Sequence, residues 1–315
     1  MKYKFGLTAL LLVLLGATSA SKIEFMDVPK FNVVTYTGGK DKNHILESTG
    51  NGVVVLDYDG DGDEDVYFVN AFSFPARGKT EPHPNVLYRN DGNGKFTDVT
   101  SAAHVGAAAY GQGGCVGDVN NDGLPDLFVT NFGPDILYLN NGDGTFTDIT
   151  ERAHIGDPRW SIGCTFFDAD GDGDHDLYVT NYVDATWQEI YNAKRTRMWR
   201  GKVPVLDGPK GLPGSMDSFY INNGNGTFSE ATEKAGLKPG SDFYGMGVVS
   251  FDYDNDGDMD IYVANDSSPN CLYRNRGNGT FEEVGTPTGA AYNADGQEQG
   301  SMGVGFGDYD NDGWF

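Results

Sequence analysis

Residues 57–65 read Asp-Tyr-Asp-Gly-Asp-Gly-Asp-Glu-Asp, and this stretch decides the fold because related copies of it recur along the chain. The copies span residues 118–126, 168–176 and 252–260, and residues 308–313 begin a fifth copy. Each follows the pattern Asp-x-Asp/Asn-x-Asp-Gly-x-x-Asp and is followed by a short apolar run. A unit that recurs roughly every 50 to 85 residues predicts an array of similar structural units.

A second motif follows each acidic loop at a variable distance. It pairs an aromatic strand pattern, such as Leu-Tyr-Arg-Asn at 87–90, with a Gly-x-Gly-x-Phe turn, and its copies begin near residues 137, 219 and 272. Two β-rich runs separated by Asn, Gly and Asp predict a hairpin. Each repeat therefore supplies about four short strands, while helical spacing is confined to short stretches such as 232–235. We predict an all-β fold, a β-propeller with about five blades in this chain, because radial stacking buries both faces of each sheet.

The acidic loops have the spacing of a calcium site. Carboxylates at alternate positions of a tight loop can converge on one hard cation, and Ca²⁺ takes six to eight oxygen ligands. Gly62 gives the backbone freedom to turn, and the main-chain carbonyl at the seventh position adds an oxygen. We predict four complete sites and a truncated fifth, with these residues: Asp57, Asp59, Asp61, Asp63 and Asp65; Asp118, Asn120, Asp122, Leu124 and Asp126; Asp168, Asp170, Asp172, Asp174 and Asp176; Asp252, Asp254, Asp256, Asp258 and Asp260; Asp308, Asp310 and Asp312.

Three other interpretations of the loops fit less well. An EF-hand carries a bidentate Glu at its twelfth position, between helices. Here the twelfth positions are the apolar residues Phe68, Val129, Val179 and Val263, so the ninth-position Asp closes the site instead. Magnesium prefers rigid octahedral geometry and retained waters. Acidic turns with no ion would leave each pair of carboxylates repelling by roughly 1 kcal/mol even in bulk water.

An insertion at about 186–214 differs from the rest of the chain because it is basic and aromatic. Trp, Tyr and Arg are enriched at interface hot spots, and long insertions in repeat proteins often form the binding face. The insertion is interpreted either as a ligand surface or as a clamp between blades. Its candidate ligand-contacting residues are Trp187, Tyr191, Arg195, Arg197, Trp199 and Arg200.

The first twenty residues have the pattern of a signal peptide, with two lysines, an apolar run over 7–15 and small residues before a cleavage point. We therefore expect residues 21–315 to form the propeller outside the cytoplasm, secreted or periplasmic, with cell-surface association as an option. No segment is long and apolar enough for a membrane span. Without Lys2 and Lys4 the chain has 20 basic and 46 acidic side chains, a formal charge of −26 that argues against nucleic acid as a partner. Because residue 315 falls inside the fifth acidic loop, we expect a propeller that is incomplete at its C-terminus.

The three cysteines, Cys115, Cys164 and Cys271, do not have zinc-site spacing and cannot all pair with one another. One disulfide is an open alternative, but cysteines are among the most frequently buried residues, and we expect free buried thiols.

The motifs together resemble a known family. The acidic loops and the Leu-Tyr-x-Asn strands, with Gly-Pro-Lys-Gly-Leu-Pro-Gly at 208–214 and Asn-Asp-Ser-Ser-Pro-Asn at 265–270, look like the FG-GAP or VCBS repeats of integrin α-subunit propellers. The chain more closely resembles the cartilage acidic protein and ASPIC/UnbV group, from about Gly50 onward. The resemblance implies seven blades in the full-length protein and calcium in the blade hairpins. The insertion lacks the cysteines common in these relatives, so the resemblance gives no support for a disulfide there.

The function expected from these features is a non-enzymatic binding or adhesion scaffold for an extracellular protein or glycan. No Gly-x-Ser-x-Gly, dinucleotide or Walker motif is present. His104 and His154 occupy equivalent repeat positions, which indicates a structural role. Asn225, Asn265 and Asn278 begin N-glycosylation sequons, which Gly-rich turns also produce by chance. The alternative is a secreted polysaccharide-active enzyme on a calcium-stabilised propeller; many paired carboxylates are available, but bound cations would keep them ionised.

Overall fold

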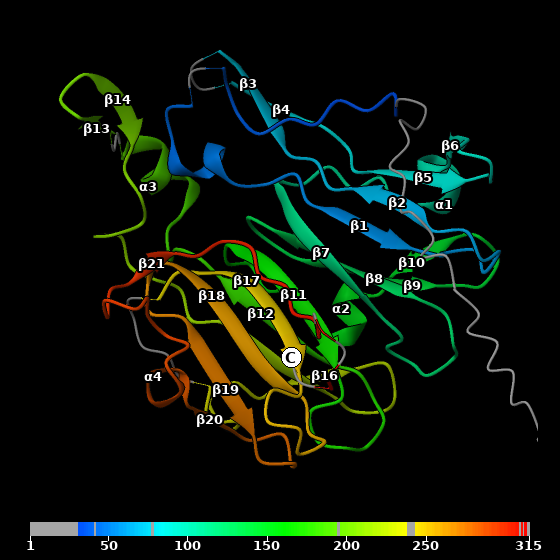
Figure 1. Ribbon diagram of the computed structural model, residues 1–315. Helices are drawn as coiled ribbons and strands as arrows, with labels where there is room; N and C mark the ends of the chain where they lie inside the picture. Colours follow the sequence, from blue (N-terminus) through cyan, green and yellow to red (C-terminus); the bar gives the residue numbers. More distant parts are fainter. Residues whose placement is uncertain are drawn as a thin grey trace, which may run out of the picture.

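The computed structural model describes residues 31–40, 42–76, 79–193, 196–237, 243–308, 310 and 312–313. The segment interpreted as a signal peptide, residues 1–20, lies outside them. Figure 1 shows that strands dominate the described part. None of its helices has the length and apolar character to cross a membrane.

Four antiparallel sheets, each of four main strands, form the body, and each corresponds to one sequence repeat. We call them blades 1 to 4. Blade 1 contains β1 (Val53–Leu56), β2 (Asp65–Phe68), β5 (Val86–Asn90) and β6 (Phe96–Asp98). Blade 2 contains β7 (Gly111–Gly117), β8 (Asp126–Asn131), β9 (Ile136–Asn140) and β10 (Phe146–Asp148).

Blade 3 contains β11 (Ser161–Phe167), β12 (Asp176–Asn181), β15 (Ser218–Asn222) and β16 (Phe228–Glu230). Blade 4 contains β17 (Gly245–Phe251), β18 (Asp260–Ser268), β19 (Cys271–Asn275) and β20 (Phe281–Glu283), and the short β21 (Gln299–Gly300) pairs with the end of β18. In every blade the acidic loop joins the first two strands, and the Asn-Gly turn joins the last two.

The blades are arranged radially, as the sequence predicts for a propeller. Their first strands lie side by side, β7 beside β1 and β11, and β11 beside β17, while the fourth strands lie at the outside (Figure 1). Residues 301–308 continue the series beside β17, where the rings of Phe251 and Phe306 stack 5.0 Å apart. The described chain therefore forms four blades of an all-β propeller and the first strand region of a fifth. The blade number of the full-length protein stays a prediction.

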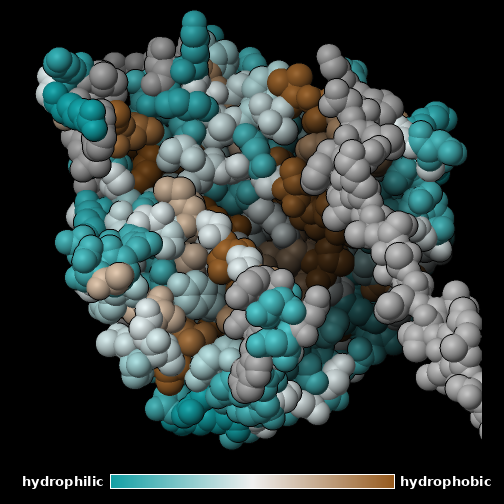
Figure 2. Space-filling model, viewed as in Figure 1, coloured by the Kyte–Doolittle hydropathy of each residue, from teal (hydrophilic) through white to brown (hydrophobic). Residues whose placement is uncertain are grey.

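The core lies between blades. β8 and β12 are buried along their whole length, as expected for strands covered on both faces. Figure 2 shows apolar surface gathered over β1, where Val53 and Val55 are 54% and 56% exposed within the described structure. This face has the apolar character of the faces that pack between blades elsewhere in the molecule.

The first strands pack so closely that glycine is required at their contacts. A Cβ atom on Gly163 would lie 2.4 Å from the carbonyl oxygen of Met246 in blade 4. A Cβ on Gly113 would lie 2.8 Å from the Ile162 carbonyl oxygen in blade 3. Thr130 uses the gap: its Oγ1 accepts from the Gly113 N–H at 2.9 Å and donates to the Ile162 oxygen at 2.7 Å. Thr180 makes the same pair of bonds between blades 3 and 4.

The structure corrects the expectation for two of the cysteines. Cys115 of β7 and Cys164 of β11 form a disulfide, with their Cα atoms 5.7 Å apart. These residues are 49 positions apart in sequence, and only the side-by-side packing of the first strands brings them together. Cys271 is a free, buried thiol, as expected.

The helices are short. Besides the 3₁₀ turn η1 (Ile45–Ser48), single turns α1 (Thr100–Ala103), α2 (Thr150–Ala153) and α4 (Gly285–Thr288) follow the fourth strands of blades 1, 2 and 4. His104 and His154 end the first two in the left-handed conformation, with φ of 63° and 60°, where Gly289 ends the third. Their repeated position is thus a structural one. The helical spacing noted at 232–235 does not form an assigned helix: these residues form a turn.

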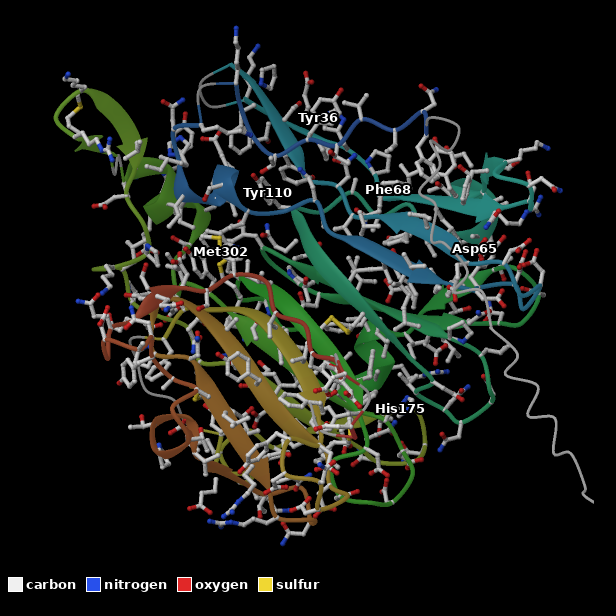
Figure 3. The ribbon with its side chains drawn as sticks, in the orientation of Figure 1. Tyr36, Asp65, Phe68, Tyr110, His175 and Met302 are labelled. Atoms are coloured by element: carbon white, nitrogen blue, oxygen red, sulfur yellow. A yellow bond between two sulfur atoms is a disulfide. The ribbon has the colours of Figure 1, made fainter. Side chains whose placement is uncertain are left out.

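The insertion lies at the ends of the blades opposite the acidic loops. It forms α3 (Trp187–Asn192) and a hairpin of β13 (Thr196–Trp199) and β14 (Val203–Leu206), which projects from the body in Figure 1. Blade 1 has its own extra hairpin at the same end, β3 (Phe72–Ala76) and β4 (Lys79–Pro82). Figure 3 shows this separation: Tyr36 and Tyr110 lie toward the insertion, whereas Asp65 and His175 lie toward the acidic loops.

The glycine contacts lead to a first prediction. Gly163→Ala should reduce the free energy of unfolding by about 1–3 kcal/mol, because the added methyl group overlaps a backbone oxygen that cannot move away alone. The matched control is Gly303→Ala, at the equivalent position of the fifth repeat, whose Cβ would meet no described atom within 4 Å. Urea unfolding measures both, and equal losses for the two variants would contradict this interpretation.

Candidate metal centre

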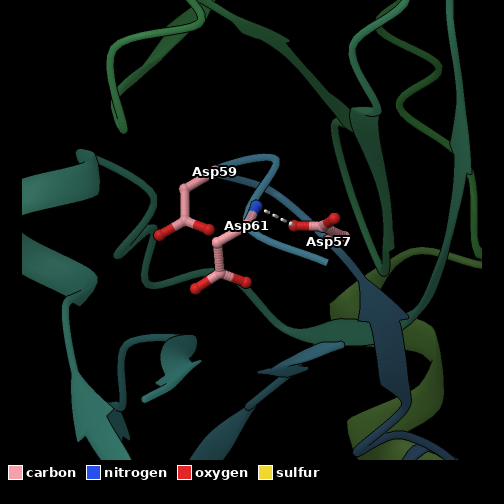
Figure 4. A group of neighbouring side chains, drawn as sticks. All are labelled: Asp57, Asp59 and Asp61. Carbon is pink, nitrogen blue, oxygen red and sulfur yellow. Dashed lines mark hydrogen bonds between the residues drawn. The ribbon is translucent and has the colours of Figure 1, made fainter. Parts of the chain in front are cut away.

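Each acidic loop is shaped by its first carboxylate. In loop 1 the Asp57 Oδ1 accepts from the N–H groups of Gly60 and Asp61 at 2.9 and 3.1 Å, and its Oδ2 accepts from Gly62 at 3.0 Å. Asp61 in turn accepts from the Asp63 N–H at 2.9 Å. Figure 4 shows the result: Asp57, Asp59 and Asp61 point toward one another from a single tight loop.

The ninth-position carboxylates are buried and tie the loop to the sheet. Asp65, Asp126, Asp176 and Asp260 are each at most 1% exposed. Asp176 Oδ2 accepts from the N–H of Ala169, the second loop residue, at 2.9 Å, and its Oδ1 accepts from the Asn222 N–H at 2.8 Å. The other three blades repeat both bonds. The ninth position thus closes the loop through main-chain hydrogen bonds, and its part as a metal ligand stays a prediction.

The predicted ligand atoms converge. In each of four groups, three carboxylates offer one oxygen apiece, and those oxygens lie within 4.8 Å of one another. The groups are Asp57, Asp59 and Asp61; Asp168, Asp170 and Asp176; Asp252, Asp254 and Asp260; and Asp308, Asp310 and Asp312. Oxygen clusters of this kind can hold a metal ion.

The third-position carboxylates show that the loops fit a cation. Oδ1 of Asp170 and Oδ1 of Asp254 are buried and have no hydrogen-bond partner. A buried carboxylate oxygen without a partner is costly unless a cation or water compensates it. The pKa values of Asp170 and Asp254 are raised, first by burial and then by the neighbouring loop carboxylates. A bound cation would remove both penalties.

Loop 2 differs from the others because Asn120 replaces the third carboxylate. Its Nδ2 donates to Asp122 Oδ2 at 2.9 Å, so the amide oxygen is the atom available to a metal. The N–H of Asp118 donates to His175 Nδ1 of loop 3 at 3.1 Å, and Asn121 donates to Asp174 at 2.5 Å. Loops 2 and 3 therefore touch each other directly.

The side chain at the seventh position has a role that the sequence did not reveal. In each blade this side chain faces a glycine in the turn between the third and fourth strands; the residues are Asp63, Leu124, Asp174 and Asp258. A Cβ added to Gly142, for example, would lie 3.0 Å from Leu124 Cδ1. The side chain packs on the turn, so only the main-chain oxygen at this position remains a candidate ligand. This explains why Leu124 can occupy a position that is Asp elsewhere.

Sequence reasoning also missed the asparagines that end the third strands: Asn90, Asn140, Asn222 and Asn275. The N–H of each donates to the ninth-position carboxylate of its own blade. The recurring Leu-Tyr-x-Asn pattern was the available signal, but the pairing of second and third strands was needed to place the asparagine against the loop.

Burial shifts the acid–base behaviour of the ninth-position carboxyls. Burial raises the pKa of Asp65, Asp126 and Asp260 to about 6 and that of Asp176 to about 7, against an ordinary value of 3.8; main-chain N–H groups oppose the rise and nearby loop carboxylates add to it. Metal binding would require these groups to be ionised.

The candidate ligand residues on the insertion fall into two groups: some pack against the blades, and others lie on the projecting hairpin. The Trp187 ring contacts those of Phe74, Tyr110 and Phe132, which come from blades 1 and 2, with centroids 5.4 to 6.4 Å apart. Tyr191 stacks on His44 at 4.8 Å. Arg200 is exposed at the turn of the hairpin. Arg195 lies outside the described residues, as do the side chains of Arg197 and Trp199.

Comparison with known proteins supports the repeat interpretation. The FG-GAP-like repeat matches residues 57–129, 118–179, 211–263 and 252–315, which together cover more than half of the chain. No curated protein matches the sequence.

Several solved structures are similar. They include an Agrocybe aegerita lectin described as recognising non-reducing terminal N-acetylglucosamine (18% identity, 74% of this chain and 65% of that chain, TM-score 0.26). The V. cholerae biofilm matrix protein Bap1 (13% identity, 74% and 38%, TM-score 0.33) and the exotype rhamnogalacturonan lyase YesX (13%, 74% and 48%, TM-score 0.33) also match. The chain thus spans 38% to 65% of the length of these proteins.

The raised pKa values predict how the metal-free protein responds to pH. Between pH 4 and 7 the folded state retains protons that the unfolded chain releases, so stability falls as pH rises through this window. Urea unfolding in excess chelator should show a loss of at least about 2 kcal/mol from pH 4.5 to 7.5. Asp176→Asn, which removes one of the titrating groups, should flatten this slope. Stability that increases with pH in chelator would show that the ninth-position carboxyls do not dominate.

Proposed function

The chain belongs to the FG-GAP-like repeat family, and we propose that it is a calcium-stabilised propeller that acts outside the cytoplasm as a non-enzymatic binding scaffold. The observation that carries the calcium assignment is loop 3. There, oxygens of Asp168, Asp170 and Asp176 lie within 4.8 Å of one another, and Asp170 Oδ1 is buried without a partner. Carboxylate, amide and main-chain oxygens are the ligands of a hard cation, and a flexible loop that offers many of them favours Ca²⁺ over Mg²⁺.

Calcium would have a structural rather than a switching role in this scaffold. The loops join strands that are already paired in the sheets, and no helix pair flanks them that could open as in a sensor. A bound ion would neutralise the loop carboxylates and fix the hairpins, which supports the blades without moving them.

The disulfide supports a location of the protein outside the cytoplasm, in addition to the N-terminal sequence pattern. Disulfides persist in oxidising compartments and are rare in the cytosol, and Cys115 and Cys164 are bridged. Extracellular calcium modules have dissociation constants on the order of 10⁻⁴ to 10⁻³ M, and free calcium outside cells is abundant enough to fill sites of that affinity.

Two buried carboxylates outside the loops, Asp135 and Asp217, are accounted for without a catalytic role. Asp135 and Asp217 accept main-chain N–H groups of Asn131 and Asn181 at 2.8 Å. In blades 1 and 4 the same bonds are accepted by asparagine, Asn85 and Asn270. A carboxylate whose place an amide fills in sister repeats has a structural role, not that of an acid or base.

The ligand surface that we propose is the β13–β14 hairpin of the insertion. The hairpin projects from the body (Figure 1), and its described residues Met198, Arg200 and Lys202 are exposed. Basic residues are few in a chain with formal charge −24, so this cluster is suited to an anionic partner, either a glycan or an acidic protein surface.

Calcium binding is tested by thermal melting and calorimetry. At 100 times its Kd, calcium should stabilise the protein by about 2.7 kcal/mol for each loop filled and raise the melting temperature by at least about 5 °C. Asp170→Ala should remove one bound ion and change the stability of the chelated protein by much less than the ion contributes, because Asp170 Oδ1 has no hydrogen-bond partner in the loop. The matched control is Asp143→Asn in the β9–β10 turn, where asparagine already serves in blades 3 and 4. An unchanged melting temperature for the wild-type protein in calcium would refute the assignment.

The binding role is tested with an array of neutral and anionic polysaccharides in calcium. Arg200→Glu with Lys202→Glu, which reverses two exposed charges, should lower binding to anionic members by at least about tenfold, and the melting temperature of the variant checks that it is folded. Lys234→Glu, in the turn after β16, is the control for reversal of one exposed charge away from the hairpin. Cleavage of any polysaccharide by the wild-type protein would favour the enzyme alternative instead.

A further inference from the structure

Three asparagines connect neighbouring blades at their acidic loops. The Nδ2 of Asn140 in blade 2 donates to the main-chain oxygen of Tyr58 in loop 1 at 2.8 Å. Asn222 of blade 3 makes the same bond to Val119 of loop 2 at 2.9 Å, and Asn275 of blade 4 makes it to Ala169 of loop 3 at 2.8 Å. All three asparagines are at most 3% exposed.

The same side chains also hold the loop of their own blade. Asn140 Nδ2 donates to the Pro125 oxygen, one residue before the ninth-position Asp126, at 3.2 Å, and its main-chain N–H donates to Asp126 Oδ1 at 2.7 Å. Asn222 and Asn275 repeat these bonds with loops 3 and 4. One buried residue therefore contacts two successive loops.

The contact on the preceding loop falls at a position that its ligands control. Tyr58 lies between the predicted ligands at the first and third loop positions, Asp57 and Asp59, and its N–H donates to the ninth-position Asp65 at 3.0 Å. The orientation of the Tyr58 carbonyl thus depends on whether the ligands on both sides are held in place. An ion that orders loop 1 would also fix the acceptor of Asn140.

We propose that Asn140, Asn222 and Asn275 are positioning residues that couple ion binding between neighbouring blades, so that the acidic loops fill cooperatively. This inference rests on the proposed calcium binding. Each asparagine must be ordered for either of its loops to be well formed, and the entropy cost of ordering it is met once. The second loop to bind therefore binds more tightly, and the effect is reciprocal.

Blade 1 contains an internal control. Asn90 occupies the same place as the three bridging residues and makes the same bonds within its blade, from Nδ2 to the Glu64 oxygen at 3.1 Å and from N–H to Asp65 at 2.7 Å. Its side chain makes no described bond to another blade. Asn90→Ala and Asn140→Ala thus remove matching bonds within a blade, and only the second removes a bridge.

Loops 1 and 2 are the best pair for the test because Asn140 is the described hydrogen-bonded bridge between them. Loops 2 and 3 are also joined through His175 and Asn121, and loop 3 is also joined to the β19–β20 turn of blade 4 through the Gly279 N–H and the Ala169 oxygen. Loop 1 also carries its own reporter, since Tyr58 can sensitise the luminescence of Tb³⁺ bound as a substitute for Ca²⁺.

The experiment uses the whole chain with Tyr253→Phe and Tyr309→Phe, which remove the tyrosines of loops 4 and 5. Tb³⁺ titrations give the Kd of loop 1 in this background, with and without Asp122→Ala, which disables loop 2. Coupling predicts that Asp122→Ala weakens loop 1 at least fivefold. The same change made together with Asn140→Ala should have less than a twofold effect, whereas with Asn90→Ala the fivefold effect should persist. Circular dichroism melts confirm that each variant is folded.

The outcomes separate the two proposals. If Asp122→Ala leaves the loop 1 Kd unchanged in the presence of Asn140, the loops bind independently and the coupling is refuted, even if Asn140→Ala does not fold. A fivefold effect that survives Asn140→Ala would assign the coupling to another path. Absence of any sensitised Tb³⁺ signal, together with no calcium effect on melting, would instead refute the calcium assignment itself.

Discussion

The crowding of carboxylates in the acidic loops, which lie at one end of the blades, is the constraint on which the rest of the structure depends. Oxygens of three acids lie within 4.8 Å of one another in each of four loops, and like charges at this distance repel. Main-chain N–H groups already oppose this repulsion at the first, fifth and ninth positions. At the third position, Oδ1 of Asp170 stays buried without a hydrogen-bond partner. The fold thus brings the acids together but leaves part of their charge for a cation to neutralise.

The opposite end of the blades has the contrary chemistry. There an aromatic layer, which includes Tyr110, Trp160 and Trp187, packs across blades under α3. Between the two ends, glycines and threonines allow the first strands to approach closely, and Cys115 and Cys164 bridge blades 2 and 3. Because each blade contacts only its neighbours, stability should depend on the interfaces between successive repeats as much as on any blade alone.

The sequence predicted the features that depend on local pattern. The acidic loops, the hairpins after them and the four strands per repeat follow from residues close together in the chain. Several copies of the same pattern support the same interpretation. The features that it missed depend on neighbours distant in sequence. Asn222 is 103 positions from Val119, and the paired cysteines are 49 positions apart. The insertion shows the same limit, since Trp187 was as compatible with a binding surface as with a clamp, and only the packing against Phe74, Tyr110 and Phe132 shows its contacts.

The turns between third and fourth strands have a consequence for how the protein would behave in different cells. In blades 3 and 4, Asn225 and Asn278 accept from the N–H and hydroxyl of Thr227 and Thr280, as Asp143 does from Thr145 in blade 2. The turn needs a side-chain oxygen that accepts a hydrogen bond and, two residues later, a residue with a hydroxyl group. When the accepting residue is asparagine, the sequence is Asn-x-Thr, which is a glycosylation sequon. In a eukaryotic secretory host, Asn225 and Asn278 would therefore be accessible glycosylation acceptors. Asn265 is only 1% exposed and would not be accessible. Glycan heterogeneity in such a preparation would come from turn geometry rather than from a recognition signal.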